Sequence, residues 1–240
     1  MRRAKRMIDF PSIADHILIW IFGIILPFLS GLQSDKLNGE IRFDAESRKK
    51  LYLGNSIMLA VAGSVIILLW YFKDRTWASM GFQMPQWNNR VVVITAIILL
   101  SVGYLTDLIY TYFFQREEGD EWFHRSSFLP QHYRELPAYV LLCCCAGIFE
   151  EIIYRGFMVN YFLEEVRETV PWLALIVPSI LFSLAHFYQG WGAVMKIFIL
   201  AMLLNLIFIY TQSLFPTMII HFLIDLLSGL AGMRKMKSNQ

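Results

Sequence analysis

Seven apolar stretches divide this chain, and most of them are long enough to cross a lipid bilayer. They run over residues 13–32, 51–72, 91–114, 137–162, 170–187, 193–210 and 216–232. A membrane-spanning helix needs about 20 apolar residues, and only a helix or a closed barrel satisfies its own backbone hydrogen bonds inside hydrocarbon. The first four stretches reach that length, and the last three fall slightly short. We therefore predict an all-α fold, a polytopic transmembrane helix bundle of seven or eight spans.

The composition supports the same class of protein. Hydrophobic residues make up 57% of the chain and charged residues 17%, whereas soluble domains average about 45–50% and about 25%. The net charge of +2 is too small to indicate nucleic acid as a partner. An integral, multi-pass protein that is surrounded by the lipid bilayer is the class that fits.

The charges near the two ends of the chain give conflicting orientations. Four of the first six residues are basic, which predicts a cytoplasmic N-terminus by the positive-inside rule. The apolar stretch 13–32 is too long for a signal-peptide core, so we expect it to stay as the first span. Seven spans would then put the C-terminus outside, although its basic residues favour the inside. An eighth span or half-span near 122–136 would remove the conflict, and residues 122–128 are alternatively an interfacial piece.

The chain shows no room for a soluble domain. The longest predicted loops cover about 33–50, 73–90 and 115–136. We divide the chain into N-terminal transmembrane helices and loops (1–136), a helical core that carries the candidate site (137–232) and a polar C-terminal tail (233–240).

Two adjacent glutamates lie inside the fourth apolar stretch. A charge at mid-bilayer costs from about 3 to more than about 10 kcal/mol, so Glu150 and Glu151 point to a function. On a helix, Glu151 and Arg155 are four residues apart, share a face and can form an ion pair. Glu150 is rotated by about 100° from Glu151 and lacks that partner. A buried carboxylate without a cation is suited to act as a general base near neutral pH.

Two histidines lie in later apolar stretches. His186 falls near the end of the fifth stretch, and His221 and Asp225 are four residues apart in the last one. An aspartate beside an imidazole can orient the ring or fix its tautomer. Each feature alone is as well explained by an interfacial histidine or a satisfied polar patch. Together with Glu150 they are the material of a catalytic site.

A metal site is the competing interpretation of the same residues. Glu150, His186 and His221 are adequate zinc ligands, and three protein ligands plus water is the usual catalytic arrangement. The chain has no His-Glu-x-x-His sequence, and the three residues lie in different predicted helices. The spacing therefore leaves the metal open.

These residues carry a resemblance to a known family. Glu150-Glu151-x-x-x-Arg155, Phe182-x-x-x-His186 and His221-x-x-x-Asp225 resemble, in order, the three signatures of the CAAX-protease and bacteriocin-processing (CPBP, Abi) family of intramembrane peptidases. The resemblance covers about residues 137–232. It implies a helical membrane fold with a catalytic cavity open to the cytoplasmic side, and hydrolysis of a peptide bond.

The resemblance also implies roles for individual residues. Glu150 would activate a water with the help of His186, and His221 and Asp225 would stabilise the oxyanion. Glu151 and Arg155 would support the geometry of the site. The prenyl-protein enzymes commonly have asparagine where this chain has Asp225, and an ionised aspartate would repel an oxyanion. We expect Asp225 to orient His221, whose N–H then donates; a protonated Asp225 and a metal ligand are the alternatives.

The function that follows is an intramembrane endopeptidase, similar to the CAAX prenyl endopeptidases and either glutamate-type or metal-dependent. Its partner would be a membrane-embedded or membrane-proximal peptide or a prenylated protein, in a bacterial cell membrane. No cofactor is required by this interpretation; zinc is the alternative. A non-proteolytic membrane regulator or bacteriocin-immunity protein on the same fold is a second hypothesis. A proton-coupled carrier with Glu150 as its proton site is a third, and the absence of a visible repeat is weak evidence against it.

Overall fold

The computed structural model describes residues 11–37, 44–113, 128–166, 170 and 172–238, and every regular element in these ranges is helical. The N-terminal half holds α1 (Ile13–Trp20), η1 (Ile21–Ile25), α2 (Leu26–Leu37), α3 (Ala45–Phe72), α4 (Trp77–Met80) and α5 (Arg90–Phe113). The second half holds η2 (Tyr133–Glu135), α7 (Leu136–Cys145), η3 (Ala146–Glu150), η4 (Ile152–Val159), α8 (Asn160–Val166), α9 (Leu173–Ala185), η5 (Phe187–Gln189), α10 (Trp191–Thr211) and α11 (Leu214–Ser238). The predicted all-α fold is confirmed.

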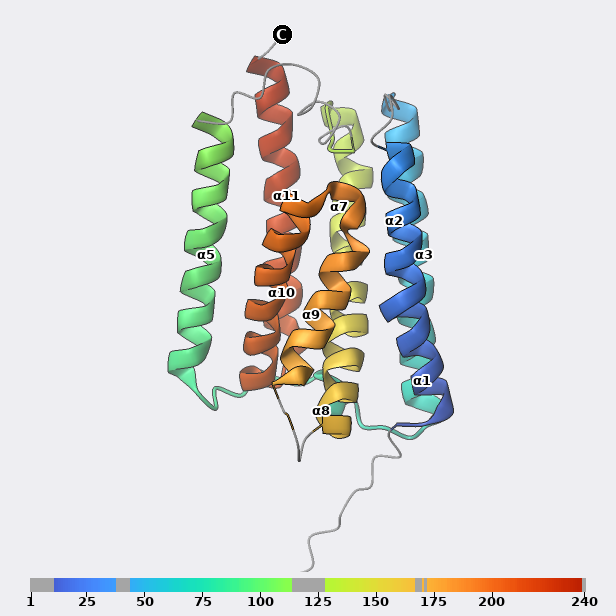
Figure 1. The fold of residues 1–240 in the computed structure, drawn as a ribbon. Coiled ribbons are helices and arrows are strands. Elements are labelled where there is room, and N and C mark those ends of the chain that lie inside the picture. Colours follow the sequence, from blue (N-terminus) through green and yellow to red (C-terminus); the bar gives the residue numbers. More distant parts are fainter. Residues whose placement is uncertain (1–10, 38–43, 114–127, 167–169, 171, 239–240) are drawn as a thin grey trace, which may run out of the picture.

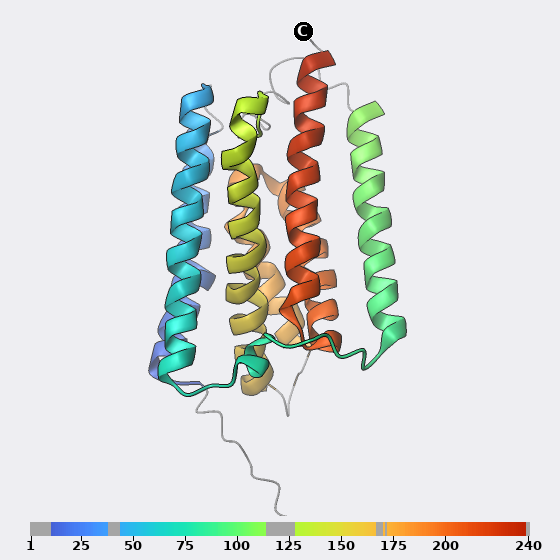
Figure 2. The same cartoon turned by 180° about the vertical axis from the view of Figure 1, so that it is seen from behind.

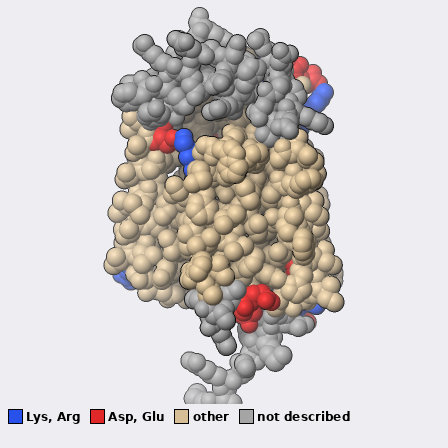
Figure 3. Space-filling model, viewed as in Figure 1, with Lys and Arg blue, Asp and Glu red and all other residues tan. Residues whose placement is uncertain are grey.

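Six of these helices, counted over the described residues, are long and apolar enough to cross a membrane. They cover Ile13–Leu32, Ala45–Phe72, Arg90–Asp107, Tyr133–Glu165, Trp191–Thr211 and Leu214–Met233, and α9 is a shorter apolar helix. These seven segments correspond to the seven predicted stretches. The space-filling view shows a broad band without charged side chains across the middle of one face, with the visible charges near its edges (Figure 3). The chain is therefore an integral membrane protein of the polytopic helical class.

The helices form two layers with one helix at the side. From behind, α3, α7, α11 and α5 stand next to one another (Figure 2). In front of α3, α7 and α11 lie α1–α2, α9 and α10 (Figure 1), and α5 packs against α10 and α11. α9 and α10 form a hairpin whose tip ends well below the upper ends of α5 and α11 (Figure 1). The tip of this hairpin therefore lies within the bundle rather than beyond it.

The structure extends the helices into segments that were predicted as a loop and a tail. The loop expected at 33–50 is largely helical, because α2 continues to Leu37 and α3 begins at Ala45, where Asp44 caps the helix by accepting the backbone N–H of Ser47 at 2.7 Å. The polar tail expected at 233–240 is helical as far as Ser238. Ile66 and Trp70 of α3 share one buried cluster with residues of η4 and α9, so the N-terminal helices pack directly against the helical core predicted at 137–232. The predicted interfacial piece at 122–128 lies almost wholly outside the described residues.

Two buried ion pairs connect parts of the bundle, one within the N-terminal half and one between the two halves. Arg75 binds Asp15 through two hydrogen bonds of 2.9 and 2.6 Å. Arg48 binds Glu135 through two hydrogen bonds of 2.8 and 3.0 Å, and both side chains are at most 2% exposed. Paired guanidinium and carboxylate groups of this kind add geometric specificity as well as energy. The Arg48–Glu135 pair connects α3 to η2, immediately before the helix that carries the glutamates.

Replacing Glu135 with alanine is expected to lower the free energy of unfolding by about 1.5–3 kcal/mol, the range for hydrogen bonds to charged groups, because it removes the carboxylate from a buried guanidinium. Thermal unfolding in detergent measures the effect. The matched control is Glu46→Ala in the Glu46–Lys50 pair, whose side chains are 74% and 75% exposed; an exposed pair contributes about 0–1 kcal/mol. Equal effects of the two substitutions would contradict a structural role for the buried pair.

Candidate active site

The glutamates lie on a helix with two wide turns. Residues 136–166 run as one helical span in which η3 and η4 have π-type hydrogen bonding on either side of Glu151. Such wide turns are frequent at functional sites. The span crosses the centre of the back layer between α3 and α11 (Figure 2). This position directs its two carboxylates and one guanidinium toward the other helices of the bundle.

Glu151 and Arg155 form the ion pair that their spacing predicts. Arg155 Nη1 donates to Glu151 Oε1 at 2.8 Å, and neither side chain is exposed. The same Glu151 oxygen lies 2.7 Å from Nδ1 of His221, which comes from α11. A carboxylate that is paired with arginine is an acceptor, so the His221 Nδ1–H is the donor. Glu151 therefore joins two helices and sets the orientation of the imidazole.

Glu150 is separate from this pair. Its Oε2 lies 3.7 Å from His221 Nε2, its side chain is 15% exposed, and the oxygen has no hydrogen-bond partner among the described residues. Buried polar atoms are nearly always hydrogen-bonded, so an exception calls for an explanation such as a catalytic role or a bound water. As the sequence predicts, the Glu151 carboxylate is paired with Arg155 and the Glu150 carboxylate is not.

Asp225, four residues after His221 on α11, also faces the Nε2 atom of His221. Asp225 Oδ2 lies 3.6 Å from His221 Nε2, and the side chain is 35% exposed. This separation is longer than a hydrogen bond. The expectation that Asp225 orients His221 is therefore corrected: the orienting hydrogen bond comes from Glu151 on the neighbouring helix. The carboxylates of Glu150 and Asp225 therefore both lie near the Nε2 atom of the His221 imidazole.

His186 lies at the tip of the α9–α10 hairpin. Its Nδ1 is 2.8 Å from the carbonyl oxygen of Phe182; because a carbonyl can only accept, Nδ1 carries the proton and Nε2 is left as an acceptor. The Phe182 ring lies 4.7 Å from the His186 ring and 5.9 Å from the His221 ring. Arg155 lies over the same ring at 4.9 Å. Phe182 is thus the apolar contact between the two histidines and the ion pair.

One residue of the site region, Asn205, was not predicted from the sequence. Asn205 of α10 accepts a hydrogen bond from Arg155 Nε at 3.0 Å and is fully buried. The signal that could have found it is an asparagine in an otherwise apolar span. Its amide can meet Arg155 only because α10 packs beside α9 and the glutamate-bearing span, and local spacing does not contain that contact.

A close approach of two backbones brings the carboxylates to His221. A Cβ atom on Gly147 would lie 3.0 Å from the carbonyl oxygen of Met218 and 3.1 Å from the backbone nitrogen of Phe222. Both of these residues belong to α11. A Cβ atom at this position would push η3 and α11 apart by a few tenths of an ångström, three residues before Glu150.

Gly147→Ala is therefore expected to reduce activity by less than the ~10²-fold that a shift of about 1 Å in a catalytic group causes, because the added Cβ displaces its neighbours by only a few tenths of an ångström. Initial rates on the cleaved peptide measure it. Gly54→Ala is the matched control, since a Cβ atom on Gly54 of α3 would contact nothing within 4 Å. Unchanged rates in Gly147→Ala would show that the close contact does not set the position of Glu150.

The described residues do not form a metal site in this arrangement. No group of three or more His, Cys, Asp or Glu side chains among them has the mutual spacing to hold a metal ion. The Nδ1 atoms of His186 and His221 are engaged by Phe182 and Glu151. These contacts leave both Nε2 atoms free, as in histidines that bind a metal, so a metal-free site is a proposal and zinc at Glu150, His186 and His221 remains its alternative.

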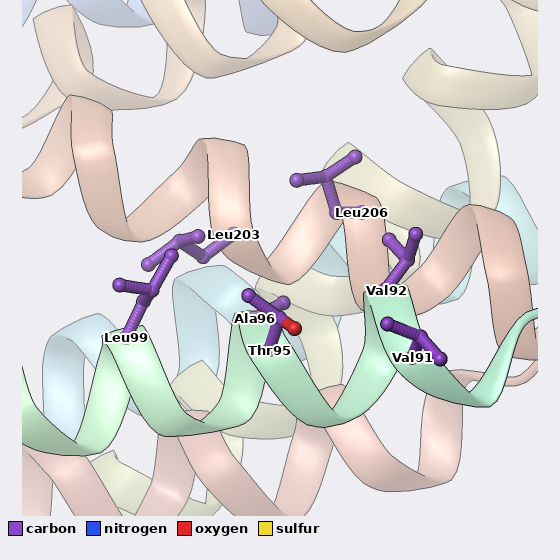
Figure 4. Close-up of a pocket in the computed structure, with 7 residues that line it drawn as sticks. All are labelled: Val91, Val92, Thr95, Ala96, Leu99, Leu203 and Leu206. Atoms are coloured by element: carbon purple, nitrogen blue, oxygen red, sulfur yellow. The ribbon is translucent and has the colours of Figure 1, made fainter.

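A pocket elsewhere in the bundle has no chemistry to compete with this site. It lies between α5 and α10 and has a volume of about 180 Å³ (Figure 4). Its lining is apolar apart from one hydroxyl: Val91, Val92, Thr95, Ala96, Leu99, Leu203 and Leu206. No titratable side chain lines it, so the catalytic candidates remain those around His221.

Comparison with known protein families gave a match that covers the region of this site. The model of the family described as type II CAAX prenyl endopeptidase Rce1-like matches residues 132–227. Searches of curated proteins and of solved structures gave no match. The matched region contains every residue of the site described above and confirms the resemblance that the three motifs indicate. Residues 132–227 are therefore similar to the family described as type II CAAX prenyl endopeptidase Rce1-like.

Proposed function

We propose that this protein is an intramembrane endopeptidase in which Glu150 is the general base that activates a water. The observation that carries the proposal is the position of Glu150 Oε2, buried, without a hydrogen-bond partner among the described residues and 3.7 Å from His221 Nε2. A side chain that serves packing alone has no reason to present an unsatisfied carboxylate oxygen to an oriented imidazole. A water beside this oxygen would lie within hydrogen-bond reach of both groups.

The proposed reaction begins with attack by this water. Glu150 takes one proton as the water oxygen bonds to the carbonyl carbon of the peptide, and His186 Nε2 accepts the second O–H as a hydrogen bond. The tetrahedral intermediate then collapses, the C–N bond breaks, and Glu150 returns its proton to the leaving amine. One group therefore serves first as base and then as acid, as general acid–base catalysis permits.

His221 is proposed to stabilise the oxyanion. Because its Nδ1–H donates to Glu151, Nε2 can donate to an oxyanion only when the ring carries a second proton. The ring then lies among three carboxylates, those of Glu150, Glu151 and Asp225. Asp225 acts in this account as a charge that faces the imidazolium, not as a donor to the oxyanion. Preorganised donors of this kind contribute about 2.7–4 kcal/mol to catalysis.

The substrate proposed is a membrane-associated peptide or protein, prenylated at its C-terminus as the family description indicates. Purified protein in lipid vesicles would be given two peptides of one sequence, ending in Cys-a-a-X with and without a farnesyl group, and a leader-type membrane peptide. Preferred cleavage of the farnesylated peptide supports this substrate class. Cleavage of the leader-type peptide alone would keep the peptidase and reject the prenylated substrate.

We further propose a bacterial cell membrane as the location of the protein. We place the N-terminus in the cytoplasm because four of the first six residues are basic. α1 begins at the lower end of the bundle and α11 ends at the upper end (Figure 1), so this orientation places the end of α11 outside. Labelling of single cysteines at Lys73 and Lys50 in a background without native cysteines tests it. Labelling of position 50 from outside the cell supports the orientation, and labelling of position 73 would reverse it.

A further inference from the structure

Asn205 lies at the centre of a buried polar network that crosses the bundle. It sits in α10, an apolar span, and its side chain is fully buried. Both halves of the amide are used: Oδ1 accepts from Arg155 Nε at 3.0 Å, and Nδ2 donates to the Leu175 carbonyl at 3.0 Å and to Ser179 Oγ at 2.9 Å. These partners fix which end of the amide faces Arg155, because only the NH₂ end can donate to a carbonyl.

The guanidinium of Arg155 is consequently held from two helices. Nη1 binds Glu151 on its own span, whereas Nε binds Asn205 and Nη2 lies 3.4 Å from the Ala201 carbonyl, both on α10. An ion pair on a single helix would leave the guanidinium free to rotate about its long side chain. The contacts from α10 fix its plane and therefore fix the Glu151 oxygen that it binds.

That Glu151 oxygen is also the acceptor for His221 Nδ1 at 2.7 Å. A continuous series of hydrogen bonds thus runs from Leu175 and Ser179 on α9 through Asn205, Arg155 and Glu151 to the imidazole on α11. All the side chains in this series are at most 4% exposed. Each hydrogen bond in such a dry environment is strong, and its loss is costly; the second Glu151 oxygen, Oε2, has no partner among the described residues.

We propose that Asn205 is a positioning residue for the proposed hydrolysis: it fixes Arg155, so that Glu151 holds His221 with Nε2 directed at Glu150 and Asp225. This inference rests on the proposed function. In it, α10 contributes none of the reacting groups but fixes the orientation of the His221 imidazole. Asn205 acts through two other side chains and touches neither the water nor the peptide.

The test compares Asn205→Leu with Thr211→Val in purified protein. Thr211 is an equally buried polar residue of α10, but its hydroxyl bonds to the Ile207 carbonyl and to the backbone of Ser213 just after the helix, not to Arg155. Two quantities are measured: kcat and KM on the cleaved peptide, and the ¹⁵N–H signal of His221 Nδ1 in histidine-labelled protein. The signal is assigned by its loss in His221→Gln.

Asn205→Leu is expected to lower kcat about 10- to 100-fold, the range seen when the outer partner of an oriented histidine is removed. KM should change less than about 2-fold, and the Nδ1–H signal should weaken or split. Thr211→Val should leave the signal and kcat as in the wild type. A normal signal and a normal kcat in Asn205→Leu, with only a lower Tm, would overturn the proposal.

Asn205→Asp keeps the test decisive if Asn205→Leu does not fold. Aspartate retains an acceptor for Arg155 Nε, and Ser179 Oγ can donate to its other oxygen in place of accepting. It also faces the Leu175 carbonyl and adds a negative charge beside Arg155, so stability should fall, whereas the Nδ1–H signal and most of kcat should remain. Loss of both in a folded Asn205→Asp protein would overturn the proposal. Because the histidine signal does not depend on turnover, a failure of the positioning role is distinguishable from a failure of the proposed peptidase activity.

Discussion

Glu150→Gln is expected to lower the rate of peptide cleavage by about 10²- to 10⁴-fold, the contribution of a general base. Glutamine has nearly the shape of glutamate but cannot take a proton from water. Since Glu150 Oε2 has no hydrogen-bond partner among the described residues, the substitution breaks no hydrogen bond of that oxygen and removes only a charge 3.7 Å from His221 Nε2. The folded protein should therefore keep its Tm. Cleavage rates in vesicles and thermal unfolding in detergent give the two quantities.

Glu164→Gln is the control for this substitution. Glu164 lies on α8, at the exposed end of the same span. Its substitution removes the same charge as Glu150→Gln, but at an exposed position outside the site. It should leave both the rate and Tm unchanged. A Glu150→Gln protein that cleaves at the wild-type rate would remove Glu150 from the mechanism, whatever its stability.

Arg155→Met is expected to lower the free energy of unfolding by about 3–5 kcal/mol, as removal of one partner of a buried ion pair does. The guanidinium is unexposed and binds Glu151, Asn205 and the Ala201 carbonyl. Its loss leaves the Glu151 carboxylate buried without its cation. The yield of folded protein and the midpoint of denaturation in detergent measure the effect.

The double variant Glu151→Gln, Arg155→Met distinguishes stability from activity. Removing both charges relieves the buried carboxylate, so much of the lost stability should return. Activity should not return, because His221 would lose the anionic acceptor of its Nδ1–H. Normal stability in Arg155→Met would contradict the structural role of the pair, and full activity in the double variant would contradict the orienting role of Glu151.

The local pairings could be predicted from the sequence, because they depend on helical spacing alone. Glu151 and Arg155 are four residues apart and form the expected ion pair. The spacing of His221 and Asp225 placed them on one face, but not within hydrogen-bond distance. The partner that orients His221 is Glu151, 70 residues earlier in the chain, and that contact depends on how α11 packs against the central span.

The overall class of fold could also be predicted, since long apolar stretches dictate spanning helices. The arrangement of the last three could not. Their shorter lengths were visible, but that α9 and α10 form a short hairpin with His186 at its tip depends on packing inside the bundle (Figure 1). Asn205 was missed for the same reason: its role exists only where α9, α10 and the central span meet.

The most direct test of the central claim is a comparison of peptide termini in cell membranes that contain either the wild-type protein or Glu150→Gln. Mass spectrometry would identify N- and C-termini that appear only with the wild-type protein, at equal amounts of the two proteins. We expect a set of new termini in membrane-associated proteins that is absent with Glu150→Gln. Identical termini in the two membranes, together with a cellular phenotype that persists in the mutant, would contradict it and favour a non-proteolytic regulator.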